Sequence, residues 1–194
     1  MLPVDVRVWA LERRGAGCVR PVRAEAGSKA MSRKMPAQKP GRSEQSVGTP
    51  REFIRSVCSF LDIEEFTIDL AADKRNRKAD LFIDEAEDSL SVDWHKYLSA
   101  RQWAWLNPPF ADIAPWVRKC AEELVCGANI AVLVPASVCT NWWRDYVHDI
   151  ADVRFPTGRL TFEGHKASYP KDLALLLYSR GRAPEYKPWN WRSE

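Results

Sequence analysis

The sequence predicts an α/β fold in which helices cover a mostly parallel sheet. Short strand-like segments alternate with helical segments along the chain, an order typical of helices packed on the faces of a parallel sheet. Residues 130–134 form an uninterrupted apolar run, as expected for a strand that is buried on both faces. Apolar side chains recur at helical spacing over 113–125, and Gly127 follows, a residue type that commonly ends helices.

The ordered part of the chain is expected to begin at Thr49. Thr49 as N-cap, Pro50 in the first helical position and Glu52 three residues after the cap form a capping box, which predicts the start of a helix. Downstream of this helix the pattern predicts two more, over 113–125 and over 142–150. It predicts strands over 66–71, 79–83, 101–106, 130–134, 153–155, 160–162 and 173–178.

Residues 1–48 differ in composition from the rest of the chain. They hold ten Lys and Arg against four Asp and Glu, with many Gly, Pro and Ser and little periodicity. We expect a disordered basic extension here, and translation from Met31 would remove most of it. The remainder is predicted to form one domain over 49–180, followed by a C-terminal tail over 181–194.

Composition narrows the class of protein. With 45% hydrophobic residues the chain can bury a core, and its net charge of +3 is too small to indicate nucleic-acid binding by itself. No apolar run approaches the ~20 residues of a membrane span, so no membrane association is expected. The histidines and cysteines lack ligand spacing, so we expect no metal site. A monomer in the cytoplasm is the expectation.

The segment Asn107-Pro108-Pro109-Phe110 is the strongest candidate for catalysis. It follows a predicted strand and precedes a helix, and ligands bind at the carboxyl ends of strands in open α/β sheets. The prolines fix the chain and leave carbonyl groups as acceptors, to which Asn107 adds a side-chain carbonyl. Two acceptors suit a planar aromatic amine, whose two protons they grip, and Phe110 offers a face on which a base can stack. The alternative is that the four residues only form a rigid turn.

The chain resembles the phage-type DNA N-6-adenine methyltransferases from about residue 49 to about residue 178. The marks of this resemblance are Thr49-Pro50, Asp69-Leu70-Ala71-Ala72, Leu90-Ser91 with Asp93-Trp94, Asn107-Pro108-Pro109-Phe110, Pro115-Trp116, and Gly158-Arg159-Leu160 with Phe162. The resemblance implies a Rossmann-like methyltransferase sandwich, S-adenosylmethionine as the methyl donor and adenine in DNA as the acceptor. The location implied is the cytoplasm of a bacterial host or of a phage-infected cell.

The resemblance also implies which residues bind the cofactor and the DNA. For the cofactor these are Thr49, Pro50, Asp69, Ala71 and Asp93, although the segment after Asp69 lacks the Gly-x-Gly of the wider superfamily. Asp69 as a helix N-cap is the structural alternative. For the DNA they are Trp142, which could equally be core, and the cations Arg159 and Lys166, which could face phosphate.

Two other functions remain open from the sequence alone. The same tetrapeptide would suit methylation of another planar nitrogen, such as a protein glutamine or an RNA base. A catalytically dead relative that only binds DNA is the other alternative, and the missing glycine loop would be its symptom.

Overall fold

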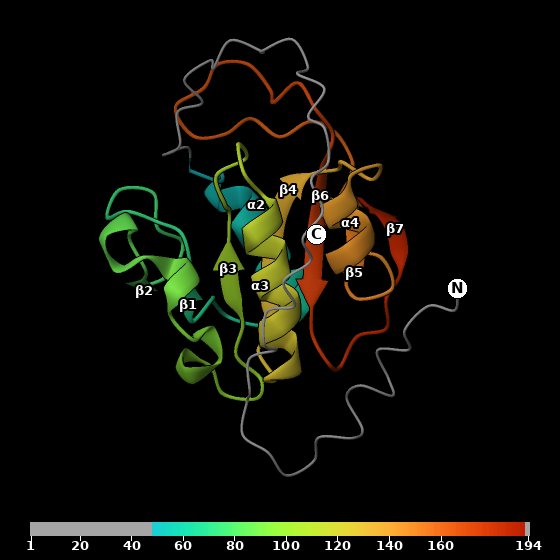
Figure 1. Ribbon diagram of the computed structural model, residues 1–194. Coiled ribbons are helices and arrows are strands. Elements are labelled where there is room, and N and C mark those ends of the chain that lie inside the picture. The colour runs from blue at the N-terminus through green and yellow to red at the C-terminus, as the bar shows by residue number, and fades with distance from the viewer. Residues whose placement is uncertain (1–47, 193–194) are drawn as a thin grey trace, which may run out of the picture. The chain divides into compact units, whose positions relative to one another are not determined.

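The computed structural model describes residues 48–192, which form an α/β unit around a seven-stranded mixed sheet (Figure 1). The strand order is β2-β1-β3-β4-β6-β5-β7. Only β6 runs antiparallel to its neighbours β4 and β5, so the sheet is mostly parallel, as predicted. The strands are β1 (Ile68–Asp69), β2 (Leu81–Phe82), β3 (Ala104–Leu106), β4 (Ile130–Pro135), β5 (Asp152–Pro156), β6 (Leu173–Tyr178) and β7 (Tyr186–Trp189).

Helices cover both faces of this sheet. Helices α3 (Ala114–Val125) and α4 (Asn141–Tyr146) lie in front of the sheet in Figure 1, and α2 (Arg51–Leu61) lies behind it. Successive residues of a strand point to opposite faces, so each central strand supplies two apolar cores. Leu106 belongs to the core under α3, whereas Trp105 belongs to the core under α2. Three short 3-10 helices lie between β2 and β3: η1 (Glu85–Glu87), η2 (Ser89–Ser91) and η3 (Trp94–Tyr97).

The helix predicted at Thr49 is present, but its cap differs from the prediction. Pro50 occupies the N-cap position of α2, and no side chain caps the helix by a hydrogen bond. The prediction of a capping box is therefore wrong. Thr49 is buried, and its hydroxyl has no hydrogen-bond partner among residues 48–192.

Two further segments differ from the sequence prediction. Residues 160–162 form no strand and lie in a loop, flanked by Gly158 and Gly164, whose backbone angles are left-handed (φ 78° and 82°). Residues 186–189, expected to be part of a tail, form the edge strand β7, which pairs with β5. Trp189 and Trp191 are buried in the core under α2, so the folded unit continues beyond residue 180.

Among residues 48–192 there is no helix with both the length and the apolar character of a membrane span.

Candidate active site

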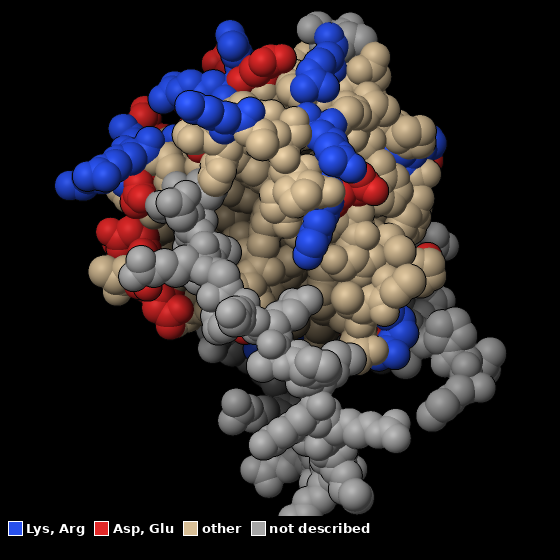
Figure 2. Space-filling model, turned by 90° about the horizontal axis from the view of Figure 1, so that it is seen from above, with Lys and Arg blue, Asp and Glu red and all other residues tan. Residues whose placement is uncertain are grey.

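The segments that follow β1 and β3 meet at one edge of the sheet. These strands are adjacent and parallel, with Ile68 paired with Ala104 and Asp69 with Trp105. Asp69 therefore ends β1 next to the end of β3, and Asn107 follows β3 directly. This carboxyl edge lies at the top of Figure 1, and Figure 2 looks down on it.

A small cavity at this edge brings together four of the residues predicted for the site. Thr49, Asp69, Ala71 and Asn107 all line it, so the candidate catalytic asparagine shares a cavity with three of the candidate cofactor residues. Its volume is about 10 Å³. The other lining residues are Gly48, Asn76, Lys78 and Trp105.

The hydroxyl of Thr49 is buried and lacks a hydrogen-bond partner among residues 48–192. Only 1% of the residue is accessible to solvent, and its Oγ1 atom finds no hydrogen-bond partner within residues 48–192. A buried hydroxyl without a partner costs free energy relative to one that is hydrogen-bonded. Its place in the cavity wall leaves Oγ1 available to a bound molecule.

Asp69 is held as a buried carboxyl by the main chain of the segment that follows it. Its Oδ1 accepts a hydrogen bond from the amide of Ala71 at 3.3 Å, and its Oδ2 accepts one from the amide of Lys78 at 2.9 Å. Burial raises the pKa of Asp69 to about 6, although these two amides and the charge of Lys78 act in the opposite direction. The residue is a carboxyl at the end of a strand, not the N-cap of a helix.

Lys78 and Asn76 line the same cavity and were not predicted from the sequence. Lys78 lies in a run of charged residues that reads as solvated surface, yet its side chain is only 4% exposed. Its Nζ pairs with Glu163 at 2.8 Å. Asn76 accepts a hydrogen bond from the amide of Asp73 and so closes the turn after β1. No local pattern distinguishes either residue from its neighbours in the sequence.

The candidate catalytic segment, residues 107–110, is braced by the loop between β5 and β6 (residues 157–172), here called the β5–β6 loop. The ring of Phe110 makes T-shaped contacts with Phe162, at 6.0 Å between centroids, and with Tyr169, at 5.6 Å. Phe162 and Tyr169 also contact each other. The amide of Tyr169 donates to the carbonyl of Leu160, which closes the loop on itself. Phe162 and Tyr169, which form an aromatic trio with Phe110, therefore set the position of the Phe110 ring.

The β5–β6 loop also reaches the other side of the cavity. The amide of Glu163 donates to the carbonyl of Gly48 at 2.9 Å, and its carboxylate pairs with Lys78. A Cβ atom on Gly48 would crowd the Glu163 carboxylate, so a larger residue here would require the Glu163 side chain to shift. One loop thus contacts both the Phe110 side and the Thr49 side of the candidate site.

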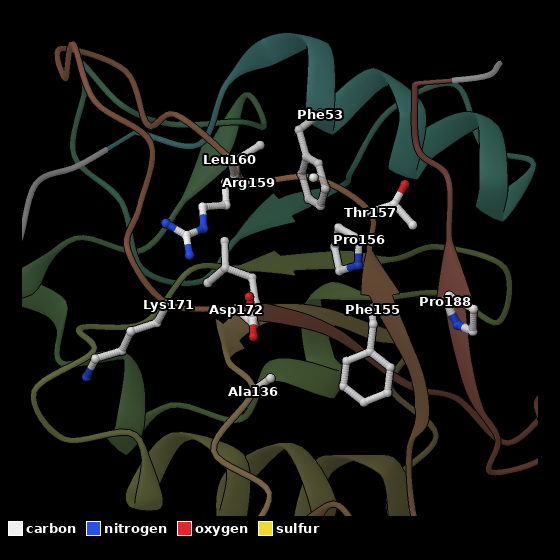
Figure 3. Close-up of a pocket in the computed structure, with 12 residues that line it drawn as sticks. Phe53, Ala136, Phe155, Pro156, Thr157, Arg159, Leu160, Lys171, Asp172 and Pro188 are labelled. Carbon is white, nitrogen blue, oxygen red and sulfur yellow. The ribbon is translucent and has the colours of Figure 1, made fainter.

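A larger pocket of about 420 Å³ opens at the same edge, beside the ends of β4 and β5 (Figure 3). Its walls combine apolar side chains, among them Leu160 and Phe155, with the cations Arg159 and Lys171. The charged ends of both cations point to the same side of the pocket in Figure 3. Arg159, predicted to contact DNA, therefore lines a different pocket from the one that holds Asn107.

The remaining predicted residues lie apart from the small cavity. Asp93 pairs with Lys96 and precedes Trp94, whose amide donates to Glu123 of α3. Pro50 caps α2 and is not a lining residue. Trp142 is half-buried in the first turn of α4, against Trp143, and Lys166 is exposed in the β5–β6 loop.

Comparison with known proteins agrees with this architecture. The model of the DNA N-6-adenine-methyltransferase (Dam) family matches residues 40–174, a span that includes both the Asp69 and the Asn107 segments. The chain is 26% identical over 139 residues to the DNA N-6-adenine-methyltransferase of Escherichia phage T1. That alignment covers 70% of this chain and 55% of the phage protein, so the chain spans about half the length of this relative. Because the family match extends over well more than half of the sequence, the chain belongs to the DNA N-6-adenine-methyltransferase (Dam) family.

Proposed function

We propose that this chain is an S-adenosylmethionine-dependent methyltransferase that modifies the N6 amine of adenine in DNA. The observation that carries the proposal is the convergence of Thr49, Asp69 and Asn107 on one cavity at the carboxyl edge of the sheet. Family membership supports this reaction and favours DNA over a protein or RNA as the substrate. The mostly parallel sheet with helices on both faces is compatible with a Rossmann-like methyltransferase fold.

The acceptor side of the reaction is assigned to Asn107 and Pro108. The lone pair of an exocyclic aromatic amine is delocalised into the ring, so the amine is a poor nucleophile. The side-chain carbonyl of Asn107 and the main-chain carbonyl of Pro108 would accept its two protons and favour a pyramidal nitrogen. With the amine held in this way, its lone pair would be directed toward the methyl group that the cofactor supplies, and one amine proton would pass to water. Positioning of this kind needs no general base.

The cofactor side is assigned to Thr49 and Asp69. When bound, S-adenosylmethionine supplies a methyl group on a positively charged sulfur. The Thr49 hydroxyl has no partner among residues 48–192, and the Asp69 carboxylate has lone pairs left after accepting two amides, so both suit hydroxyl or ammonium groups. A cavity of about 10 Å³ holds no more than about one water molecule, so binding requires its walls to separate.

The test is to express the protein in a methylation-deficient bacterial host and to sequence the genomic DNA by a single-molecule method that detects N6-methyladenine. We expect modified adenines in a defined sequence context, and none from a matched strain that expresses Asn107→Ala. Purified protein should transfer tritiated methyl groups to duplex DNA but not to protein or RNA. Unmodified DNA from cells that contain soluble, folded protein would contradict the proposal.

A further inference from the structure

A basic groove lies between α2 and the segment that follows β1, outside the small cavity. Its volume is about 630 Å³. Six cations line it: Arg51 and Arg55 from α2, and Lys74, Arg75, Arg77 and Lys78 from the segment after β1. Seen from above, Lys and Arg side chains gather toward the side of the molecule on which β1 and β2 lie (upper left in Figure 2).

Four of these cations have no acidic partner among the described residues. Arg77 pairs with Asp80, and Lys78 pairs with Glu163. No ion pair joins Arg51, Arg55, Lys74 or Arg75 to an acid within residues 48–192. All four side chains are exposed, so their charge is available to an external anion.

A helix and a tight turn set the backbone positions from which the cations project. Arg51 and Arg55 are four residues apart on α2, so their side chains leave the same face of the helix. The carboxylate of Asp73 accepts hydrogen bonds from the amides of Arg75 and Asn76, which folds the segment into a tight turn. This turn presents Lys74 and Arg75 opposite the helix.

Two of the three acids that line the groove lie away from the candidate active site, and the third, Asp80, pairs with Arg77. Glu64 and Glu65 follow the end of α2, an 11-residue helix, and so lie about 15 Å from Arg51 along its axis. At the other end, Lys78 lines both the groove and the cavity that holds Asn107. Positive charge is therefore concentrated toward the site.

We propose that this groove binds the phosphate backbone of the DNA substrate next to the target adenine. An open groove with unpaired cations suits a polyanion better than a small apolar ligand, because nine of its thirteen lining residues are charged. Contacts to phosphate position the protein and carry no sequence information. The inference rests on the proposed function, because it takes DNA as the substrate.

The test is a titration of a fluorescein-labelled duplex by anisotropy, at salt concentrations from about 50 to about 200 mM. The variants are the pairs Arg51→Gln with Arg55→Gln and Lys74→Gln with Arg75→Gln. The control pair is Arg101→Gln with Arg118→Gln, which removes two exposed positive charges elsewhere on the unit.

Each groove pair should weaken binding on the order of tenfold or more near 0.1 M salt and reduce the slope of log affinity against log salt by about two. The loss should be equal for duplexes of different sequence, and calorimetric binding of S-adenosylmethionine should not change. The control pair should behave like the wild type. Wild-type slopes in both groove pairs, together with active wild-type enzyme, would overturn the groove and leave the function standing. A wild-type protein that neither binds nor methylates DNA would overturn both.

Discussion

The Nζ atom of Lys78 lies 2.8 Å from Oε2 of Glu163, which joins the segment after β1 to the β5–β6 loop. Lys78 holds Asp69 through its main-chain amide, and Glu163 precedes the turn that carries Tyr169 to Phe110. This single ion pair therefore connects the side of the site proposed for the cofactor with the side proposed for the base.

Breaking this pair should destabilise the protein more than breaking a surface pair. Glu163→Gln removes the ion-pair partner of the buried Lys78 ammonium, so the free energy of unfolding should fall by about 1 to 2 kcal/mol. A double-mutant cycle with Lys78→Met, measured by chemical denaturation, should give a coupling energy of about 1 kcal/mol.

The matched control for this cycle is the pair Arg118–Glu122, which is 3.8 Å apart and about half exposed on α3. Its coupling energy should be no more than about 0.5 kcal/mol. Equal coupling energies for the two pairs would show that the Lys78–Glu163 contact does not hold the two segments together.

Ionisation of Asp69 should make cofactor binding depend on pH. Since burial raises its pKa to about 6, the carboxylate is mostly charged at pH 7.5 and mostly protonated at pH 5. Affinity for S-adenosylmethionine, measured by calorimetry, should fall as the pH drops through about 6. Asp69→Asn should bind weakly at both pH values and lose this dependence, while its affinity for DNA stays near that of the wild type.

Stability should change in the opposite direction with pH. The pKa of Asp69 rises from an ordinary 3.8 to about 6, so between these values the folded state binds more protons than the unfolded state. The contribution of Asp69 to stability is therefore fully present below about pH 3.8 and lost as the pH rises through about 6. The difference in free energy of unfolding between Asp69→Asn and the wild type should shift in favour of the variant from pH 5 to pH 7.5. A constant difference would mean that Asp69 titrates normally.

Asn107 should be required for methyl transfer but not for cofactor binding. Replacing it with Ala removes one of the two acceptors proposed for the amine, and loss of one such positioned group costs on the order of 100-fold or more in rate. Calorimetric affinity for S-adenosylmethionine should stay within a few-fold of the wild type. Near-normal turnover of Asn107→Ala in a tritiated-methyl assay would remove this residue from the catalytic segment.

The sequence indicates which strand ends meet at the candidate site better than it indicates the contacts around them. Asp69 ends β1 and Asn107 directly follows β3, and parallel strands bring their carboxyl ends to one edge, so the proximity of the two residues follows from the pattern. The contact between Lys78 and Glu163 joins residues 85 positions apart, and no local pattern indicates it. Strand β7 contains Pro188 and lies at the edge of the sheet, a place where proline is tolerated but where it conceals the strand signal.

Thr49 lines the small cavity, although the capping role that the sequence predicts for it is wrong. The spacing to Glu52 is typical of a capping box, whose mechanism requires the hydroxyl to accept a main-chain amide of the helix. In the structure the helix begins one residue later, the hydroxyl accepts no main-chain amide within residues 48–192, and Thr49 lines the small cavity. Spacing along the chain identifies a threonine before a helix, but only the packing of the segment decides which way Oγ1 points.

The target adenine should leave the duplex before it reacts. Its amine is paired in the major groove, so Asn107 and Pro108 cannot accept both of its protons there. Extrusion costs a few kcal/mol, and stacking on Phe110 would offset part of this cost. Neither Phe162 nor Tyr169 lies parallel to the Phe110 ring, at interplanar angles of 68° and 67°, so neither of them stacks flat against it.

A duplex with 2-aminopurine at the target position should therefore become more fluorescent when the protein binds. Phe110→Ala should weaken binding and rate, whereas Phe110→Tyr should keep most activity because the ring remains. Tyr169→Phe keeps its ring against Phe110 and should behave like the wild type, which makes it the control for the aromatic trio. Thermal denaturation of each variant separates loss of packing from loss of stacking. Unchanged fluorescence, together with a folded and active Phe110→Ala enzyme, would show that residues 107–110 form a turn that holds no base.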